Sequence, residues 1–516
     1  MNTESPPLPR RGLALAAALS LLCAASCAAK DDATPAAQGD QPPTAASAQP
    51  AAAAAPTSKT PTAAAAQATC AGPATRGPLA WFSDDYSAAL ACARATGRPL
   101  VIDLWAPWCH TCLSMKKTVL VDRSLAPLAE RFVWLELDTD KESNAPALAK
   151  FPPQVWPTFF VVAPADESVQ ARFLGAASVV QFRDFVSDGE KAALAAEKLP
   201  ADSPLALVRA GDRAMAEGAY SAAQSAYSRA VATLPADSTR RPDVLVALIS
   251  AHYKGDDAAG CMAVARGHMD QTGTAASAAD FLLYAHRCAA ELSEKGDQGD
   301  AAGAAASGGQ DIAALRRTAV RRLETLIADG DAPLSVDDRG EAMRIAREYL
   351  IALGDRDGAR AMAERQRTLL DRAAADAPNP FAAMTYNWPR AEVYAYLDAA
   401  AELIPALQKS VDDLPNEYDP PYRLSWVYAQ IGQHDKAAAL IDTALARAYG
   451  PRKAHMQRLA AEIHKARGDV AGERAARQAV VDLYEALPAG QQQPAALAKA
   501  RSALAAVAGQ GSPATK

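Results

Sequence analysis

Two cysteines separated by two residues, Cys109 and Cys112, stand in the stretch WAPWCHTC at residues 105–112. Such a pair can serve as a redox centre, as half of a zinc site or as a small structural disulfide. Zinc sites commonly take ligands from two such pairs, whereas this chain has no second Cys-x-x-Cys motif and only 7 histidines. A disulfide across so short a loop is strained, and strained disulfides are the labile ones. We therefore expect redox chemistry at this pair, with no metal and no other cofactor.

The residues around the pair predict the elements that position it. Residues 100–105 (LVIDLW) form a short apolar run between Pro99 and Pro107, which indicates a buried strand. A helix is expected to begin at about Cys109. We expect Cys109 to be exposed at this helix start. Because the N–H groups and the dipole of a helix start stabilise a thiolate, the pKa of Cys109 should fall from about 8.5 toward roughly 4 to 7.

Strands and helices alternate on both sides of this motif. Strands are expected at residues 132–138, 158–163 and 169–174, and helices at 84–96 and 179–192. Such alternation predicts one small α/β domain, which we place at residues 79–198.

The stretch VIDLWAPWCHTC resembles the thioredoxin family, and the resemblance extends beyond the cysteines. Asp103 precedes Cys109 at the distance where thioredoxins carry a buried acid, and Trp108 matches an aromatic position of the motif. The residues that match the family's cis-proline loop, which faces the cysteines in that fold, are Trp156, Pro157 and Thr158.

The resemblance implies a role for each of these residues. Cys109 would attack a substrate disulfide, and Cys112 would resolve the mixed disulfide that results. Asp103 would accept the proton of Cys112, because a buried carboxyl with a raised pKa suits a base near neutral pH; the alternative is a hydrogen-bonded core aspartate. Pro157, in a cis bond, would place the backbone against the sulfurs, so that a substrate peptide could pair with that edge. His110 would add positive charge beside the first cysteine, unless it is an exposed residue without effect.

The motif also departs from the family pattern. Thioredoxin has Gly-Pro between its cysteines, whereas this chain has His110 and Thr111. The lysine that pairs with the buried acid from the following strand is absent, and Trp134 occupies that place. The charged segment after the motif is more similar to periplasmic thioredoxin-like domains of transmembrane thiol reductases. The direction of the reaction, reduction or oxidation, therefore stays open.

The N-terminus predicts export and lipid attachment. Arg10 and Arg11 precede an apolar run too short to span a membrane, as in a secretory signal peptide. The run ends in AASC, which resembles the lipobox of bacterial lipoproteins and makes residues 1–26 the signal and Cys27 the lipid-bearing residue. An ordinary cleavage near Ala28 and a twin-arginine signal are the alternatives. We expect a periplasmic protein anchored to a bacterial membrane, the outer rather than the inner, because no aspartate follows the cysteine.

Export would place the remaining cysteines in an oxidising compartment, where thiols are usually paired. Residues 27–78 consist mostly of Ala, Pro, Thr and Gln, so we expect a disordered linker there. Cys70 and Cys92 are candidates for a disulfide that ties this linker to the domain, although Cys92 is most simply a buried core residue. Cys261 and Cys288 lie on adjacent predicted helices, and we expect a structural disulfide between them rather than two buried thiols.

After Pro200 the strand signals stop and helical hairpins follow, which we assign to residues 199–510. Small and aromatic residues fall at the offsets of a tetratricopeptide repeat (TPR), and two late copies are in phase at a period of about 34 residues. The residues of the first copy are Gly211, Gly218, Tyr220, Ala223, Tyr227, Ala230 and Pro235. We expect an α-solenoid, with a non-repetitive helical bundle as the alternative. A flexible loop is expected at residues 296–310 (GDQGDAAGAAASGGQ).

Together these features predict an α/β thioredoxin-like domain followed by an all-α TPR-like solenoid, behind a disordered N-terminal linker. The expected function is a membrane-anchored thiol-disulfide oxidoreductase that reduces client proteins, takes electrons from a membrane thiol-disulfide donor and binds protein partners through its repeats. A net charge of −6 without a basic stripe argues against a nucleic-acid partner. The alternative is a scaffold lipoprotein in which the thioredoxin-like part is a docking module. The intact cysteine pair, Asp103 and Pro157 argue against that alternative.

Overall fold

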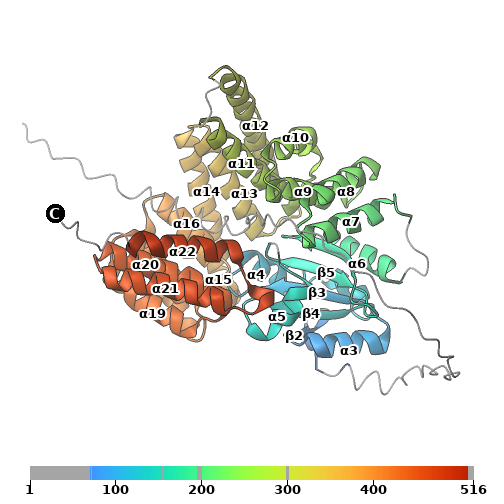
Figure 1. The fold of residues 1–516 in the computed structure, drawn as a ribbon, viewed down its shortest axis with the longest axis horizontal. Helices are drawn as coiled ribbons and strands as arrows, with labels where there is room; N and C mark the ends of the chain where they lie inside the picture. The colour runs from blue at the N-terminus through green and yellow to red at the C-terminus, as the bar shows by residue number, and fades with distance from the viewer. Residues whose placement is uncertain (1–69, 71, 154, 195–199, 298–301, 509–516) are drawn as a thin grey trace, which may run out of the picture.

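The computed structural model describes residues 70, 72–153, 155–194, 200–297 and 302–508 (Figure 1). The predictions for residues 1–69, namely the signal peptide at 1–26, the lipid-bearing Cys27 and most of the linker, lie outside the described residues. The described chain contains an α/β part and a helical part, which we call the helical repeats. Among the helices that the structure describes, none has both the length and the apolar character that a membrane span requires.

A six-stranded sheet forms the centre of the α/β part, in the order β1-β2-β4-β3-β5-β6. Its strands are β1 (Ala74–Arg76), β2 (Leu79–Ser83), β3 (Leu100–Trp105), β4 (Val133–Asp138), β5 (Thr158–Val162) and β6 (Val169–Leu174). Around the sheet lie α3 (Tyr86–Thr96), α4 (His110–Lys117), η1 (Arg123–Leu128), η2 (Glu142–Asn144), α5 (Ala145–Lys150) and α6 (Val179–Leu194). β3 runs parallel to β4 and antiparallel to β5, and apolar cores cover both of its faces. This burial explains why its sequence is a continuous apolar run.

The sheet begins earlier than the sequence predicts. β1 lies within the 27–78 segment that we expected to be a linker, and it pairs antiparallel with β2. β1 is an edge strand of only 3 residues with exposed side chains, so it leaves no hydrophobic pattern to read. Cys70, just before β1, is joined to Cys92 of α3 by a disulfide, which ties the end of this segment to the domain.

The helical repeats follow α6 and consist of consecutive antiparallel helices. The first half contains α7 (Pro204–Ala216), α8 (Tyr220–Thr233), α9 (Arg241–Lys254), α10 (Ala258–His268), η3 (Met269–Gln271), α11 (Ala276–Asp297), α12 (Ala302–Ala328), α13 (Val336–Ala352) and α14 (Arg356–Ala375). The second half contains α15 (Pro380–Met384), α16 (Asn387–Tyr396), η4 (Ala400–Leu403), α17 (Ile404–Asp413), α18 (Asp419–Gln430), α19 (His434–Arg447), η5 (Gly450–Arg452), α20 (Lys453–Ala466), α21 (Val470–Ala486), η6 (Ala489–Gln491) and α22 (Pro494–Ala508). The expected loop at 296–310 is wrong at both ends, because residues 296–297 end α11 and residues 302–310 form the first turns of α12.

Small residues let paired helices approach closely, as the repeat signature predicts. A Cβ on Gly211 of α7 would lie 2.5 Å from the ring of Tyr227 on α8, and Tyr227 is fully buried. Gly218 joins the two helices with a positive φ of 71°, which other residues adopt only at a cost. The later hairpin of α18 and α19 repeats this arrangement, with Ala437 and Ala444 fully buried.

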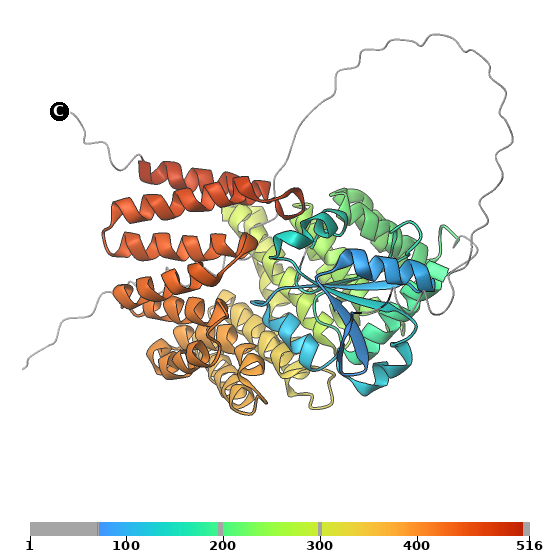
Figure 2. The same ribbon diagram turned by 90° about the horizontal axis from the view of Figure 1, so that it is seen from below.

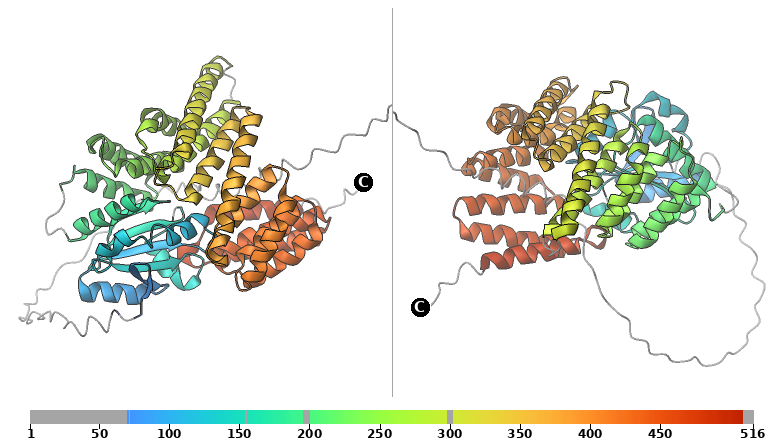
Figure 3. Two further views of the ribbon diagram at one scale, coloured as in Figure 1. Left: turned by 180° about the vertical axis from the view of Figure 1, so that it is seen from behind. Right: turned by 90° about the horizontal axis from the view of Figure 1, so that it is seen from above.

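The helical repeats bend around the α/β part and contact it at several elements (Figure 2 and Figure 3). α7 contacts β6, α13 and α15 contact α4, and η6 contacts α5. Apolar cores continue across these contacts: Ala276 of α11 joins the core of the sheet, and Trp108 packs against a core of the helical repeats. The helix that begins at the cysteine pair therefore lies at the junction of the two parts.

Candidate active site

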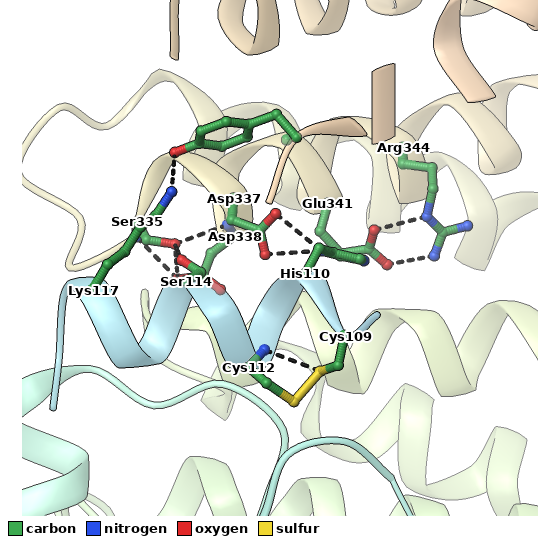
Figure 4. Close-up of polar contacts among 12 residues, drawn as sticks. Cys109, His110, Cys112, Ser114, Lys117, Ser335, Asp337, Asp338, Glu341 and Arg344 are labelled. Atoms are coloured by element: carbon green, nitrogen blue, oxygen red, sulfur yellow. Dashed lines mark hydrogen bonds and ion pairs between the residues drawn. A yellow bond between two sulfur atoms is a disulfide. The ribbon is translucent and has the colours of Figure 1, made fainter. Parts of the chain in front are cut away.

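The cysteine pair follows β3, with Cys109 just before α4 and Cys112 in its first turn (Figure 4). Cys109 is the N-cap of α4, with extended backbone just before the first helical residue. Its sulfur accepts a hydrogen bond from the backbone N–H of Cys112 at 3.0 Å, and the two cysteines form a disulfide. A free thiolate at this N-cap would keep the same N–H donor and gain the helix dipole, and both stabilise its negative charge.

The pair is more deeply buried than the sequence suggests. Cys109 is only 5% exposed and Cys112 only 1%, so the expectation of an exposed Cys109 is wrong. Trp108 and Trp156 pack beside the pair, with their ring centroids 5.3 Å apart. These two rings pack against the pair, and Trp108 also packs against a core of the helical repeats, a contact of which a local motif gives no sign.

The loop before β5 lies next to the cysteine motif. The peptide bond between Trp156 and Pro157 is cis. β5 pairs with β3 so that Thr158 lies opposite Leu104, near the end of β3 from which the motif follows. The carbonyl of Pro157 accepts the N–H of Gly175 at 3.0 Å, and the buried hydroxyl of Thr158 donates to a backbone carbonyl of its own loop at 2.7 Å. The structure therefore brings the expected proline loop and the cysteines together at one end of the neighbouring strands β3 and β5.

Asp103 is the buried acid of the site and is 1% exposed on β3. Its carboxyl oxygens have no hydrogen-bond partner among the described residues, and Nζ of Lys116 lies 4.0 Å away. Burial raises the pKa of Asp103 to about 7, with the charge of Lys116 acting against that rise and the charge of Glu136 adding to it. A carboxyl with such a pKa can take up or release a proton near neutral pH.

Lys116 is a candidate site residue that the sequence analysis missed. The family's lysine on the strand after the motif is absent, and the structure brings a lysine from α4 to the acid instead. Lys116 also forms an ion pair with Glu136, which lies opposite Asp103 in the register of β3 and β4. Lys116 follows Cys112 by one helical turn, so both residues lie on the same side of α4. The spacing between Cys112 and Lys116 was the signal in the sequence that could have identified this lysine.

A second side of α4 contacts the helical repeats through polar pairs (Figure 4). Nδ1 of His110 lies 2.9 Å from both carboxyl oxygens of Asp337 on α13. The other pairs are Ser114 with Ser335 at 3.0 Å and Lys117 with the hydroxyl of Tyr386 at 2.8 Å. We call these pairs the α4 seam.

The carboxylates across the seam set the charge of His110. Burial favours its neutral ring, but the charge and hydrogen bond of Asp337 outweigh burial, and Glu341 and Glu392 add to the effect. The pKa of His110 therefore rises to about 9. His110 is thus paired and charged at neutral pH, and it is not a free surface side chain.

Trp108, the residue before the pair, contacts the helical repeats at another place. Its indole N–H donates to the carboxyl of Asp140 at 2.8 Å, and the guanidinium of Arg452 lies 4.3 Å from its ring centroid. Asp140 also accepts a hydrogen bond from Tyr418 of the helical repeats at 3.1 Å. Burial, and next the charge of Asp138, raise the pKa of Asp140 to about 7. The cysteine motif is therefore contacted by the helical repeats on both sides.

The other four cysteines among the described residues are paired away from this site. Cys70 bonds to Cys92, which packs in a core on one face of the sheet. Cys261 of α10 bonds to Cys288 of α11, and both are fully buried within the helical repeats. These disulfides join neighbouring elements of the fold.

Comparisons with known proteins cover the two parts separately. Residues 80–164, which span β2 to β5 and include the cysteine pair, match the family described as Thioredoxin-like. A tetratricopeptide repeat protein from Parabacteroides merdae is 11% identical and covers 58% of this chain and 97% of its own, with a TM-score of 0.36. TTC0263, a TPR protein of Thermus thermophilus, is 15% identical and covers 51% of this chain and 98% of its own, with a TM-score of 0.26. No curated protein matches the sequence.

Proposed function

We propose that this chain, a thioredoxin-like α/β fold followed by TPR-like helical repeats, is a thiol-disulfide oxidoreductase that reduces disulfides of client proteins. The observation that carries the proposal is the position of Cys109 at the N-cap of α4, with the N–H of Cys112 directed at its sulfur. The disulfide between these cysteines corresponds to the oxidised end state of the reaction.

The reaction begins with the reduced pair. The thiolate of Cys109 attacks one sulfur of a client disulfide, so that a Cys109–client bond forms, the client bond breaks and the leaving sulfur takes up a proton. Cys112 then loses its proton and attacks Cys109, which releases the second client sulfur as a thiolate. Two electrons pass from the pair to the client, and a donor dithiol returns the pair to its reduced state.

Asp103 acts as the proton acceptor of Cys112 in this proposal. Its pKa of about 7 and its unpartnered oxygens among the described residues suit that role. Lys116 acts through Asp103 as a positioning residue, because its charge opposes the effect of burial on that carboxyl. Pro157 and its loop present the backbone edge on which a client strand would pair.

The proposed location is the periplasm, with Cys27 as the lipid anchor in the outer rather than the inner membrane. The N-terminal sequence supports this location, and three cysteine pairs that are joined as disulfides fit an oxidising compartment. A membrane thiol-disulfide protein would donate the electrons, and the helical repeats would bind protein partners.

The reduction potential of the Cys109–Cys112 pair tests the proposal. The full chain is equilibrated with glutathione redox buffers, and alkylation followed by mass spectrometry reports the peptide that carries both cysteines. The buried disulfides at Cys92 and Cys261 should stay oxidised and serve as internal controls. A potential near that of thioredoxin, about −270 mV, identifies a reductase, and one near −120 mV identifies an oxidant of clients. A pair that exchanges with no buffer contradicts the proposed enzyme.

A scaffold function is the second candidate, and the burial of Cys109 favours it. A cysteine residue that is only 5% exposed fits a docking module without turnover. The same potential measurement separates the two, since a scaffold needs no exchange.

A further inference from the structure

The helical repeats reach the α/β part at several places around the cysteine pair. The α4 seam contacts the helix that begins there (Figure 4). Asp280 of α11 lies against Gly175, because a Cβ on Gly175 would be 2.8 Å from its carboxyl oxygen. Gly175 donates its N–H to Pro157, so Asp280 lies beside the proline loop. Arg452 covers Trp108 on the remaining side.

Cys109 is only 5% exposed and lies among these contacts, so its burial restricts what can reach its sulfur. Exchange requires a client sulfur to approach the attacking thiolate directly. A protein disulfide brings its neighbouring surface, and a protein–protein contact of standard size covers about 800 Å² on each partner. A small disulfide such as glutathione disulfide needs only a narrow path to the sulfur. Protein clients therefore require a displacement of the helical repeats that small disulfides do not.

We propose that the helical repeats are a size filter for the redox pair and that Asp337 is the specificity-determining residue that keeps the filter closed. Small disulfides react with the closed form, and protein disulfides react when the α4 seam opens. This inference rests on the proposed function and adds to it the class of substrate that each state accepts.

Asp337 is the strongest single contact of the seam. Its side chain is 1% exposed, and both of its oxygens lie at hydrogen-bond distance from His110. Hydrogen bonds with an ionised donor or acceptor are roughly twice as strong as neutral ones. The pair of His110 and Asp337 is the only one of the three seam pairs in which both partners can carry a charge at neutral pH. The neighbouring Glu341 is already paired with Arg344 at 2.8 Å, so it does not replace Asp337 as the partner of the imidazole.

The start of α13 is built to present Asp337 rigidly. Ser335 is the N-cap of α13 and forms a reciprocal capping box with Asp338. The hydroxyl of Ser335 also accepts a hydrogen bond from Ser114 of α4, next to the pair of His110 and Asp337. The first turn of α13 thus combines its own cap with the contact to α4.

The test compares a protein probe with a small probe. The full chain is reduced at Cys109 and Cys112 with dithiothreitol, freed of reagent and mixed with insulin or with glutathione disulfide. Reoxidation of the pair is followed by quenched alkylation and mass spectrometry. In Asp337→Asn, the ratio of the insulin rate to the glutathione disulfide rate should rise about tenfold. The ratio removes any change in the reactivity of the Cys109 thiolate, because both rates depend on it equally.

Two further variants make the result specific. Tyr386→Phe removes the hydroxyl that accepts from Lys117, so it loosens the same seam and should raise the ratio in the same direction. Asp469→Asn is the matched control, since His464 and Asp469 form the same kind of pair at 2.8 Å within α20 and its following turn. The ratio should not change in that variant.

The outcomes separate this inference from the function on which it rests. A ratio that is the same in the wild type, Asp337→Asn and Tyr386→Phe overturns the filter, while exchange with both probes upholds the redox function. A wild-type pair that reacts with neither probe overturns the redox function itself, and the filter with it.

Discussion

At the scale of single residues, the site depends on one ammonium group shared between two carboxyls. Lys116 is 4.0 Å from Asp103 and forms an ion pair with Glu136. Asp103 thus has a cation nearby without a direct hydrogen bond, and burial remains the largest influence on its pKa. This arrangement leaves Asp103 able to change protonation state near neutral pH.

Replacing this lysine should move the pH dependence of the reaction. In Lys116→Met the pKa of Asp103 should rise further above its value of about 7, because the attraction that lowers it is lost while Glu136 still raises it. The pH profile of glutathione disulfide reduction should therefore shift upward by about one pH unit. Stopped-flow rates between pH 5 and 10 measure it. Lys409→Met removes an exposed lysine paired with Asp413 and is the control; equal profiles for both variants would refute the role of Lys116.

Sequence reasoning at this scale works where the motif is local. Cys109, Cys112 and Asp103 lie within ten residues of each other, and one strand–helix unit positions them. Asp337 follows His110 by 227 residues, and no pattern near either residue pairs them. Contacts of that separation arise from how the two parts pack, which a local pattern does not encode.

At the scale of elements, α4 has only 8 residues and has Cys109 as its N-cap, the lysine beside the buried acid and the α4 seam. Its two sides therefore serve two parts of the molecule. β3 and β6 could be predicted with the observed bounds, Leu100–Trp105 and Val169–Leu174, because each forms a compact strand pattern between breakers. The start of α12 could not, because its Gly, Ala and Ser residues are typical of a loop and give no hydrophobic period.

The pair of His110 and Asp337 in the α4 seam should make the folded chain less stable at alkaline pH. Asp337 raises the pKa of His110 from 6.5 to about 9 against the effect of burial, and Glu341 and Glu392 face the same ring. The stabilisation is complete below pH 6.5, where His110 is protonated in both folded and unfolded chains, and it is lost as the pH rises through 9.

The melting temperature should therefore fall between pH 6.5 and 9 in the wild type, and this fall should be smaller in Asp337→Asn. Calorimetry across that range measures it, with Asp469→Asn as the control. Parallel curves for the wild type and Asp337→Asn would show that the pair does not stabilise the seam.

At the scale of the whole molecule, the α/β part and the helical repeats each contain a structural disulfide, and the two parts are held together by packing. Cys70–Cys92 lies in the α/β part and Cys261–Cys288 in the helical repeats. No disulfide joins the two parts among the described residues. Their relative position therefore depends on noncovalent contacts such as the α4 seam, and these contacts can open without any bond being broken.

The disulfide of the helical repeats should affect stability without affecting the redox pair. Removing it with Cys261→Ala and Cys288→Ala frees a loop with a sequence separation of 27 residues in the unfolded chain. Such a loop predicts a loss of about 3 kcal/mol. Chemical denaturation followed by far-ultraviolet circular dichroism measures the loss, and the glutathione equilibrium of Cys109 and Cys112 should stay unchanged. A shifted glutathione equilibrium would show that the Cys261–Cys288 disulfide influences the redox pair through the contacts between the two parts.

The contact between η6 and the α/β part has a consequence for how the protein is made. Gln491 donates a hydrogen bond to the backbone carbonyl of Thr139 at 2.8 Å, across 352 residues of chain. The sheet and α4 are made from residues 74–174, whereas the contact from η6 can form only after nearly the whole chain has been translated. At about 5–20 residues per second, that interval lasts tens of seconds. Under the proposed filter, the cysteine pair of a newborn chain is therefore open to its surroundings first, and it becomes selective only when the molecule is finished.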